Sequence, residues 1–209
     1  MSSQQSHIEI ERKYDVDEET SLPHLVGSGA VAVASTPETH QLDAVYFDTA
    51  DCALAASLIA VRQRRGGADE GWHVKLPQSG EGRREVQWPL GDSDEPPQAV
   101  REFLSAQLGV ENLERLVPLA RISNTRTVVV LHDAAGFDLA EVCDDHVRSE
   151  NLRTGGTDSW REWEVELLGG APDSRRGRAA LLDAIQERLI VAGARSASSA
   201  SKLHRALGA

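Results

Sequence analysis

The chain has 209 residues, of which 40% are hydrophobic and 26% charged, a composition typical of a folded soluble protein with one large or two small domains. Its formal net charge of −11 argues against a protein that binds nucleic acid over its whole surface, and no uninterrupted apolar run is long enough to cross a bilayer. Cys52 and Cys143 lack the spacing of a metal site, which favours free thiols in a reducing cytoplasm.

The first predicted strand, at 7–14, alternates between isoleucine and charged residues. Its charged face carries Glu9, Glu11 and Lys13. Two carboxylates two positions apart can share one hard divalent cation such as Mg²⁺, and the lysine next to them suits a phosphate. A solvated strand face with a weak ion pair is the alternative interpretation of the same residues.

The rest of the chain is mostly strand. Taken in order, its patterns predict a short helix at 18–28, a strand at 40–48, a helical turn at 51–57, strands at 58–65, 71–76 and 83–90, a helix at 98–108, strands at 119–132, 136–150 and 158–168, and helices at 174–192 and 199–207. Short turns between strands favour an antiparallel sheet or barrel with helices packed outside. No repeat or clear linker divides the chain, so we expect a single domain over 1–209, with a flexible N-terminus at 1–6 that lacks a signal-peptide pattern.

Four of the later strands repeat the division into a charged and an apolar face. Their charged faces carry Arg62 and Arg64; His73 and Lys75; Arg83, Glu85 and Gln87; and Glu162, Glu164 and Glu166. In an open sheet such a face would meet solvent. Because the predicted helices need apolar strand faces to cover, however, the charged faces should line an interior, and buried charge is costly unless it is paired or binds a ligand. The pattern therefore predicts a polar tunnel for a highly charged ligand, with Trp72, Trp88 and Trp163 pointing outward and His73 a hydrogen-bonded structural residue.

The charges also separate by sign. The basic group consists of Arg62, Arg64, Lys75 and Arg83, with Arg121 and Arg126 further along, and the acidic group consists of Glu9, Glu11, Glu164 and Glu166. Arginine makes forked contacts with phosphate oxygens, whereas lysine supplies a point charge. A basic wall that faces an acidic, metal-holding wall suits a polyphosphate.

In this order the residues resemble the CYTH family, also called triphosphate tunnel metalloenzymes, which includes class IV adenylyl cyclases and thiamine triphosphatases. The resemblance covers roughly residues 7–205 and rests on Glu9-x-Glu11-x-Lys13, Tyr46-Phe47-Asp48-Thr49, Arg62-x-Arg64, Lys75, Arg83-x-Glu85, Arg126, Glu164-x-Glu166 and Lys202. It implies an α+β fold, with an eight-stranded antiparallel β-barrel open as a tunnel and helices outside. It also implies hydrolysis or cyclisation of a triphosphate, with Mg²⁺ or Mn²⁺ held by the glutamates.

Two positions depart from the family pattern. Many members have a second acid where this chain has Gln87. The acid expected on the strand before the last Glu-x-Glu is ambiguous, because Glu141 and Asp144 have opposite strand phases and at most one faces the tunnel. We favour Asp144.

The resulting hypothesis is a divalent-metal-dependent triphosphatase that acts on inorganic triphosphate or another small triphosphorylated compound. The predicted metal ligands are Glu9, Glu11, Asp144, Glu164 and Glu166. The predicted catalytic cations are Lys13, Arg62, Arg64, Lys75 and Arg126, and these bind substrate together with Arg83, Glu85, Arg121 and Lys202. A class IV-type adenylyl cyclase and a non-catalytic polyphosphate- or nucleotide-binding module are the alternatives. We expect no nucleic-acid or membrane partner, and the sequence does not predict the oligomeric state.

Overall fold

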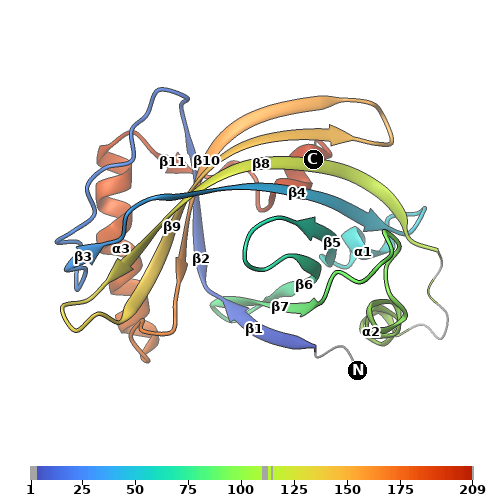
Figure 1. The fold of residues 1–209 in the computed structure, drawn as a ribbon, viewed down its shortest axis with the longest axis horizontal. Coiled ribbons are helices and arrows are strands. Elements are labelled where there is room, and N and C mark those ends of the chain that lie inside the picture. Colours follow the sequence, from blue (N-terminus) through green and yellow to red (C-terminus); the bar gives the residue numbers. More distant parts are fainter. Residues whose placement is uncertain (1–3, 110–112, 114, 209) are drawn as a thin grey trace.

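The computed structural model describes residues 4–109, 113 and 115–208 and is built mainly from β-strands (Figure 1). The strands are β1 (Gln5–Glu9), β2 (Glu11–Val16), β3 (Val33–Ala34), β4 (Glu38–Asp48), β5 (Ala60–Arg65), β6 (Gly71–Ser79), β7 (Gly82–Trp88), β8 (Val117–His132), β9 (Asp138–Asn151), β10 (Thr157–Leu167) and β11 (Arg195–Ser196). The helices are α1 (Ala53–Ala56), α2 (Gln98–Leu108), α3 (Arg175–Val191) and α4 (Lys202–Ala206). None of the helices described here is long and apolar enough to span a membrane.

The strands form one antiparallel sheet whose order is β1-β7-β6-β5-β4-β8-β9-β10-β2-β11, with β3 paired to β8. The long strands β4, β8, β9 and β10 curve over one side of the molecule, and β5, β6 and β7 lie on the other (Figure 1). The prediction of a closed, eight-stranded barrel is therefore wrong in these two details. Within the described part of the chain the sheet has eleven strands and is not closed by hydrogen bonds.

The N-terminal segment contributes one edge strand, β1, and the strand next to the other edge, β2. Strand β1 pairs with β7, and β2 pairs with β10, so the single strand expected at 7–14 is divided at Ile10. The Ile10 carbonyl accepts a hydrogen bond of 2.9 Å from the amide of Leu167. The continuous chain around Ile10 thus links the β7 side of the curved sheet to its β10 side. The side chains before and after Ile10 therefore face the same interior.

Two helices cover the outer, convex face, as the alternation of the strands predicts. Helix α3 buries Leu181 and Ile185 against a cluster that includes Tyr14, Trp163 and Val165. Helix α2 buries its apolar side in a second cluster that contains Val100, Leu104, Val61, Trp72, Val74, Val86 and Trp88. Burial of these large side chains, each worth about 1.5–3 kcal/mol, fixes which strand faces point outward.

Helix α4 differs from the expected arrangement because it lies on the inner, concave face. Its residues Leu203 and Ala206 pack with Ile122, Val147 and Trp160, and the guanidinium of Arg205 lies 4.7 Å from the ring centre of Trp160. Trp160 shares the inward phase of the glutamates on β10, so the concave face offers a small apolar patch beside its charges. The expectation that all helices pack outside is wrong for this one.

The helix expected at 18–28 does not form. This segment contains turns instead, with Gly27 and Gly29 at positive φ, and its Leu25 packs in the cluster beneath α3. Of the N-terminus expected to be flexible, residues 1–3 lie outside the described residues, whereas Gln5 and Ser6 pair with β7.

Candidate functional site

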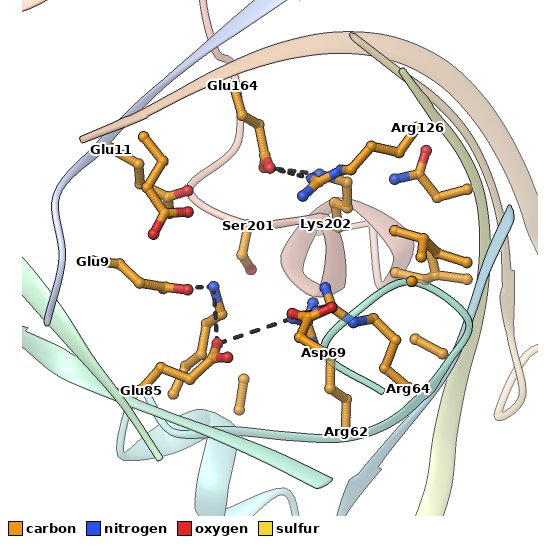
Figure 2. A pocket seen from close by; sticks show the side chains of 18 of the residues that line it. Glu9, Glu11, Arg62, Arg64, Asp69, Glu85, Arg126, Glu164, Ser201 and Lys202 are labelled. Carbon is orange, nitrogen blue, oxygen red and sulfur yellow. Dashed lines mark hydrogen bonds and ion pairs between the residues drawn. The ribbon is translucent and has the colours of Figure 1, made fainter. Parts of the chain in front are cut away.

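The concave face of the sheet encloses a charged pocket of about 460 Å³. Strands β1, β2, β4 to β10 and the start of α4 contribute to its wall, and the charged side chains converge from all sides (Figure 2). The charged residues that line it are His7, Glu9, Glu11, Lys13, His40, Arg62, Arg64, Asp69, Lys75, Arg83, Glu85, Arg126, Glu141, Glu164, Glu166 and Lys202. Side chains from both ends of the chain meet here because β2 pairs with β10.

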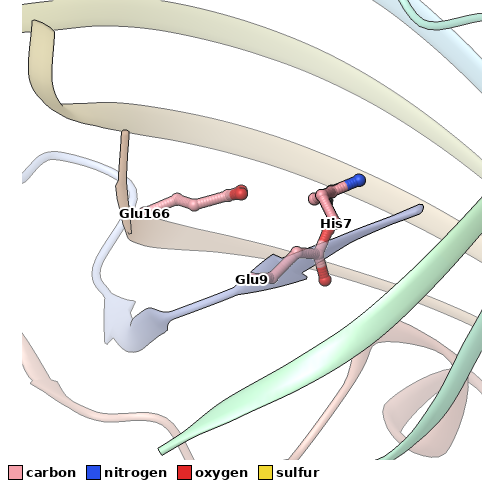
Figure 3. A group of neighbouring side chains, drawn as sticks. All are labelled: His7, Glu9 and Glu166. Atoms are coloured by element: carbon pink, nitrogen blue, oxygen red, sulfur yellow. Dashed lines mark ion pairs between the residues drawn. The ribbon is translucent and has the colours of Figure 1, made fainter. Parts of the chain in front are cut away.

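One side of the pocket is a group of carboxylates in which Glu9 and Glu11 each have a lysine partner. Glu166 makes no salt bridge within the described residues. His7, Glu9 and Glu166 have ligand atoms within 4.8 Å of one another, and Figure 3 shows them from two separate strands facing a common space. Glu11 and Glu141 are the register partners of Glu166 on β2 and β9. Burial, and then the charge of Glu9, raises the pKa of Glu166 to about 7. The neighbouring carboxylates repel one another when ionised, and a divalent cation would relieve this repulsion. Their oxygen atoms are the ligands that a hard cation prefers.

A second group of carboxylates already has its cations. The Lys202 ammonium lies 2.8 Å from Asp145 Oδ2, 2.6 Å from Glu162 Oε1 and 2.8 Å from Glu164 Oε1. Arg126 donates 2.7 and 2.6 Å hydrogen bonds to Asp145 and a 2.5 Å bond to Glu164. Burial opposes ionisation of Asp145, but Lys202 and Arg126 lower its pKa to about 2. The sequence prediction made Glu164 a metal ligand, whereas in the structure it is held by cations.

The lysines of the pocket are bound to the glutamates beside them. Lys75 Nζ lies 2.6 Å from Glu9 Oε2. Lys13 Nζ lies 2.9 Å from Glu11 Oε2 and also pairs with Glu164. These contacts outweigh the effect of burial and raise the pKa values of both lysines. Both therefore remain charged. Lys13 lies between the two carboxylate groups, and Lys75 lies between Glu9 and Glu85.

The arginines form the side opposite the first group of carboxylates (Figure 2). Arg62 donates a 3.4 Å hydrogen bond to the hydroxyl of Tyr46, and its Nη2 lies 4.0 Å from Glu85. The Nε atoms of Arg62 and Arg64 are buried, and within the described residues nothing accepts a hydrogen bond from them. Spare, buried guanidinium donors are what a phosphate oxygen needs. The arrangement brings Arg62, Arg64 and Arg126 together as the sequence predicts.

Three predicted site residues take other positions. Asp144 does not line the pocket: its carboxylate accepts hydrogen bonds of 2.8 and 2.7 Å from Arg161 on the convex side. Arg121 is exposed and five positions from Arg126, so it lies on the outer face. Arg83 lines the pocket, but its guanidinium donates to backbone carbonyls at the strand edge.

Sequence reasoning assigned no role to three residues in or beside the pocket. Asp145 and Glu162 hold Lys202, and His7 lies 3.7 Å from Glu9. Strict alternation from Glu141, which does line the pocket, would have pointed to Asp145 rather than Asp144. His7 could have been found by extending the alternation of Glu9 one step towards the N-terminus.

Glu85 and His73 form a buried support under the arginines. His73 Nδ1 lies 2.5 Å from Glu85 Oε1, and Glu85 Oε2 lies 3.1 Å from Lys75 Nζ. Burial opposes ionisation of Glu85, yet Lys75 and His73 hold its pKa far below the ordinary value. Glu85, predicted to bind substrate, lines the pocket and lies beside Lys75 and Arg62. His73 is buried and hydrogen-bonded, as expected of a structural residue.

A second cavity of about 590 Å³ adjoins the charged pocket. It shares Glu9, Glu11, Lys13 and Arg83 with that pocket, and the rest of its wall combines apolar side chains with polar ones such as Arg12 and Glu81. Its apolar lining includes Leu58, Ile59, Pro77, Ala197, Leu203 and Leu207. The charged interior therefore opens on one side into a less polar mouth between α1, β5 and α4.

Comparison with known proteins defines the class to which this fold and pocket belong. Residues 7–198 match the CYTH domain. The chain is also 41% identical over 215 residues to uncharacterised proteins from two strains of Mycobacterium tuberculosis, a match that covers 97% of this chain. The chain thus belongs to the CYTH family, as its sequence motifs indicate. It spans 40% of the length of these mycobacterial relatives.

Solved structures share the fold at lower identity. A candidate adenylate cyclase from Bacillus halodurans has a TM-score of 0.64 at 21% identity, covering 96% of this chain and 97% of its own. A candidate adenylyl cyclase from Hippeastrum, described as having a dominant triphosphatase activity, has a TM-score of 0.57 at 18% identity, covering 100% of this chain and 96% of its own. At these identities the likeness concerns the fold alone.

Proposed function

We propose that the protein is a divalent-metal-dependent triphosphatase that hydrolyses inorganic triphosphate or another small triphosphorylated compound within the charged pocket. The observation that carries this proposal is the division of one pocket into a group of closely spaced carboxylates and a group of buried arginines. Within the described residues, Glu166 of the carboxylate group makes no salt bridge. Neutral or cationic substrates would leave the arginines without new partners, and a lone anion would meet the repulsion of the carboxylates. A phosphate chain accompanied by a divalent cation matches both sides.

Glu9, Glu11 and Glu166 are the residues that would hold the cation, with Glu141 close by in register. Their fit rests on the close spacing of the Glu9 and Glu166 ligand atoms. The raised pKa of Glu166, caused first by burial and then by the charge of Glu9, is consistent with it. The second carboxylate group fits a metal poorly, because Lys202 already contacts all three of its members. A bound Mg²⁺ or Mn²⁺ would supply electrophilic stabilisation of phosphoryl oxygens.

The chain's own cations would bind and orient the phosphates. Arg62, Arg64 and Arg126 offer forked donors on one side, while Lys13 and Lys75 provide point charges near the carboxylates. Because they are held in place by Tyr46, Glu85 and the buried carboxylates, little reorganisation is needed when charge develops on the transferred phosphoryl group. No residue of the pocket is assigned as a general base.

The second cavity is a specific observation in favour of a second candidate, an organic triphosphate whose apolar group occupies the mouth near Leu58 and Leu203. Against it, Trp72, Trp88 and Trp163 are buried in the outer clusters. The inward-facing Trp160 is covered by Arg205 and packs against α4, so none of the four is placed to stack on a base in the pocket. We therefore place inorganic triphosphate ahead of ATP.

A phosphate-release screen tests the proposal. Inorganic triphosphate, pyrophosphate, ATP and thiamine triphosphate would each be incubated with Mg²⁺ or Mn²⁺, and cyclic AMP would be measured in parallel. We expect faster turnover of inorganic triphosphate than of ATP and little cyclic AMP. Cyclic AMP as the main product, with triphosphate left intact, would replace the hydrolase with a cyclase. Bound but intact ligands would indicate a non-catalytic binding module.

A further inference from the structure

The turn between β5 and β6 lies over the pocket, with residues 67–70 exposed to solvent. Its residues Gly67 and Asp69 line the pocket (Figure 2). Gly66 and Gly67 have φ values of 80° and 78°, and a Cβ on Gly66 would lie 2.1 Å from the Gln41 carbonyl oxygen. Only glycine allows so close an approach to β4. The turn is thus built to lie over the arginine side of the pocket.

The backbone of this turn is anchored by two side chains. The Asp69 carbonyl oxygen lies 2.9 Å from His73 Nε2 and accepts a 2.9 Å hydrogen bond from Gln87 Nε2. Gln87 occupies the position where many family members have an acid, and a carboxylate there could not donate this bond. The anchoring holds the Asp69 backbone in place and leaves only its side chain to move.

The Asp69 carboxylate forms an ion pair with Arg64. The two partners differ in exposure: the side chain of Arg64 is 8% exposed and that of Asp69 is 53% exposed. Burial, and then the charges of Arg62 and Arg126, lower the pKa of Arg64 to about 9. Arg64 is therefore a buried cation beside two like charges, and its partner is one that solvent reaches and that can rotate away.

We propose that the Asp69 carboxylate is an internal counter-ion that occupies Arg64 in the ligand-free protein and must be displaced by a phosphate group of the incoming chain. This makes Asp69 an affinity-setting residue. Asp69 lies in the turn that follows Arg64 along the chain. Its carboxylate therefore competes at a high effective concentration with any anion that binds Arg64. The inference rests on the proposed binding of a phosphate chain at the arginines and deepens it by naming the group that the chain replaces.

A double-mutant cycle tests this competition. The dissociation constant of inorganic triphosphate would be measured by calorimetry in EDTA at fixed ionic strength, for the wild type, Asp69→Asn, Arg64→Gln and the double variant. We expect Asp69→Asn to bind roughly threefold to fivefold more tightly, the range for a half-exposed ion pair. The gain should vanish in the Arg64→Gln background, because the carboxylate then has nothing to occupy.

Glu70→Gln is the matched control, since it removes one negative charge from the same turn without touching Arg64. An equal gain in Glu70→Gln, no gain in Asp69→Asn, or a gain that persists without Arg64 would each overturn the proposal. Sulfate serves as a second probe in the same cycle. Tighter sulfate binding by Asp69→Asn, with triphosphate neither bound nor hydrolysed, would support the counter-ion role and refute the proposed function. Normal hydrolysis with an unchanged dissociation constant in Asp69→Asn would support the proposed function and refute the counter-ion role.

Discussion

The raised pKa of Glu166 predicts how the stability of the metal-free protein depends on pH. Glu166 lies on β10 beside Glu9 and Glu11. In the unfolded chain its carboxylate has the ordinary pKa of 4.5. In the folded protein, burial and then Glu9 raise the pKa to about 7. The folded state therefore keeps a proton on Glu166 between these two values, where the unfolded state has lost it.

The sign follows from proton linkage. Below pH 4.5 Glu166 is protonated in both the folded and the unfolded state. Its ionisation then takes nothing from the free energy of unfolding of the protein. As the pH rises towards 7, ionisation favours the unfolded chain, and the folded protein loses stability until Glu166 ionises as well. The difference between 4.5 and about 7 corresponds to a loss of about 3 kcal/mol.

Substitution Glu166→Gln should remove this loss while keeping the side chain's size. In EDTA, the variant should match the wild type near pH 4.5 and become more stable by up to about 3 kcal/mol above pH 7, a rise of several degrees in melting temperature. Urea unfolding across this pH range measures the difference directly. Glu150→Gln, at an exposed carboxylate on β9, is the control and should show no such trend. A Glu166→Gln curve parallel to that of the wild type would refute the reasoning.

Three further predictions concern other groups of the site. Glu11→Gln should lower metal-dependent phosphate release roughly 100-fold or more without lowering the melting temperature, and an unchanged metal titration would remove Glu11 from the ligand set. Lys202→Met leaves three buried carboxylates without their shared cation, so the free energy of unfolding, measured by chemical denaturation at pH 7, should fall by about 3–5 kcal/mol. Wild-type stability would mean that these contacts do not hold α4. Arg121→Ala should keep wild-type kcat and KM because Arg121 is exposed on the outer face, whereas Arg126→Ala should lose activity, and equal losses would contradict the assigned faces.

The strand faces could be predicted from sequence because alternation and helix covering act together. A helix must bury an apolar face, so Trp163 and Val165 point towards α3, and Glu164 and Glu166 must then point inward. The same rule, applied strictly, excludes Arg121 and Asp144 from the pocket. Asp144 is favoured for a position of the family pattern, and Arg121 is grouped with Arg126 by its charge. In both cases the parity of the strand is not kept.

Other features depended on tertiary structure that no local pattern carries. Helix α4 has only five residues, too few for its periodicity to show whether it packs inside or outside. The segment 18–28 has helix-forming acids at its start, but Pro23 interrupts it and Leu25 gains more by packing beneath α3. The break at Ile10 lets one segment pair with both β7 and β10, which are distant in sequence.

The cations of the pocket are already paired in the protein alone, and this determines what ligand binding can contribute. Lys75 and Lys13 are held by Glu9 and Glu11, the carboxylates that we propose as metal ligands. A cation that takes these carboxylates weakens their hold on the lysines, so the lysines become available to phosphate. Binding of metal and binding of phosphate should therefore strengthen each other, and by linkage the factor must be the same in both directions. Each partner alone would exchange one set of ion pairs for another, whereas the two together leave every charge in the pocket with a partner.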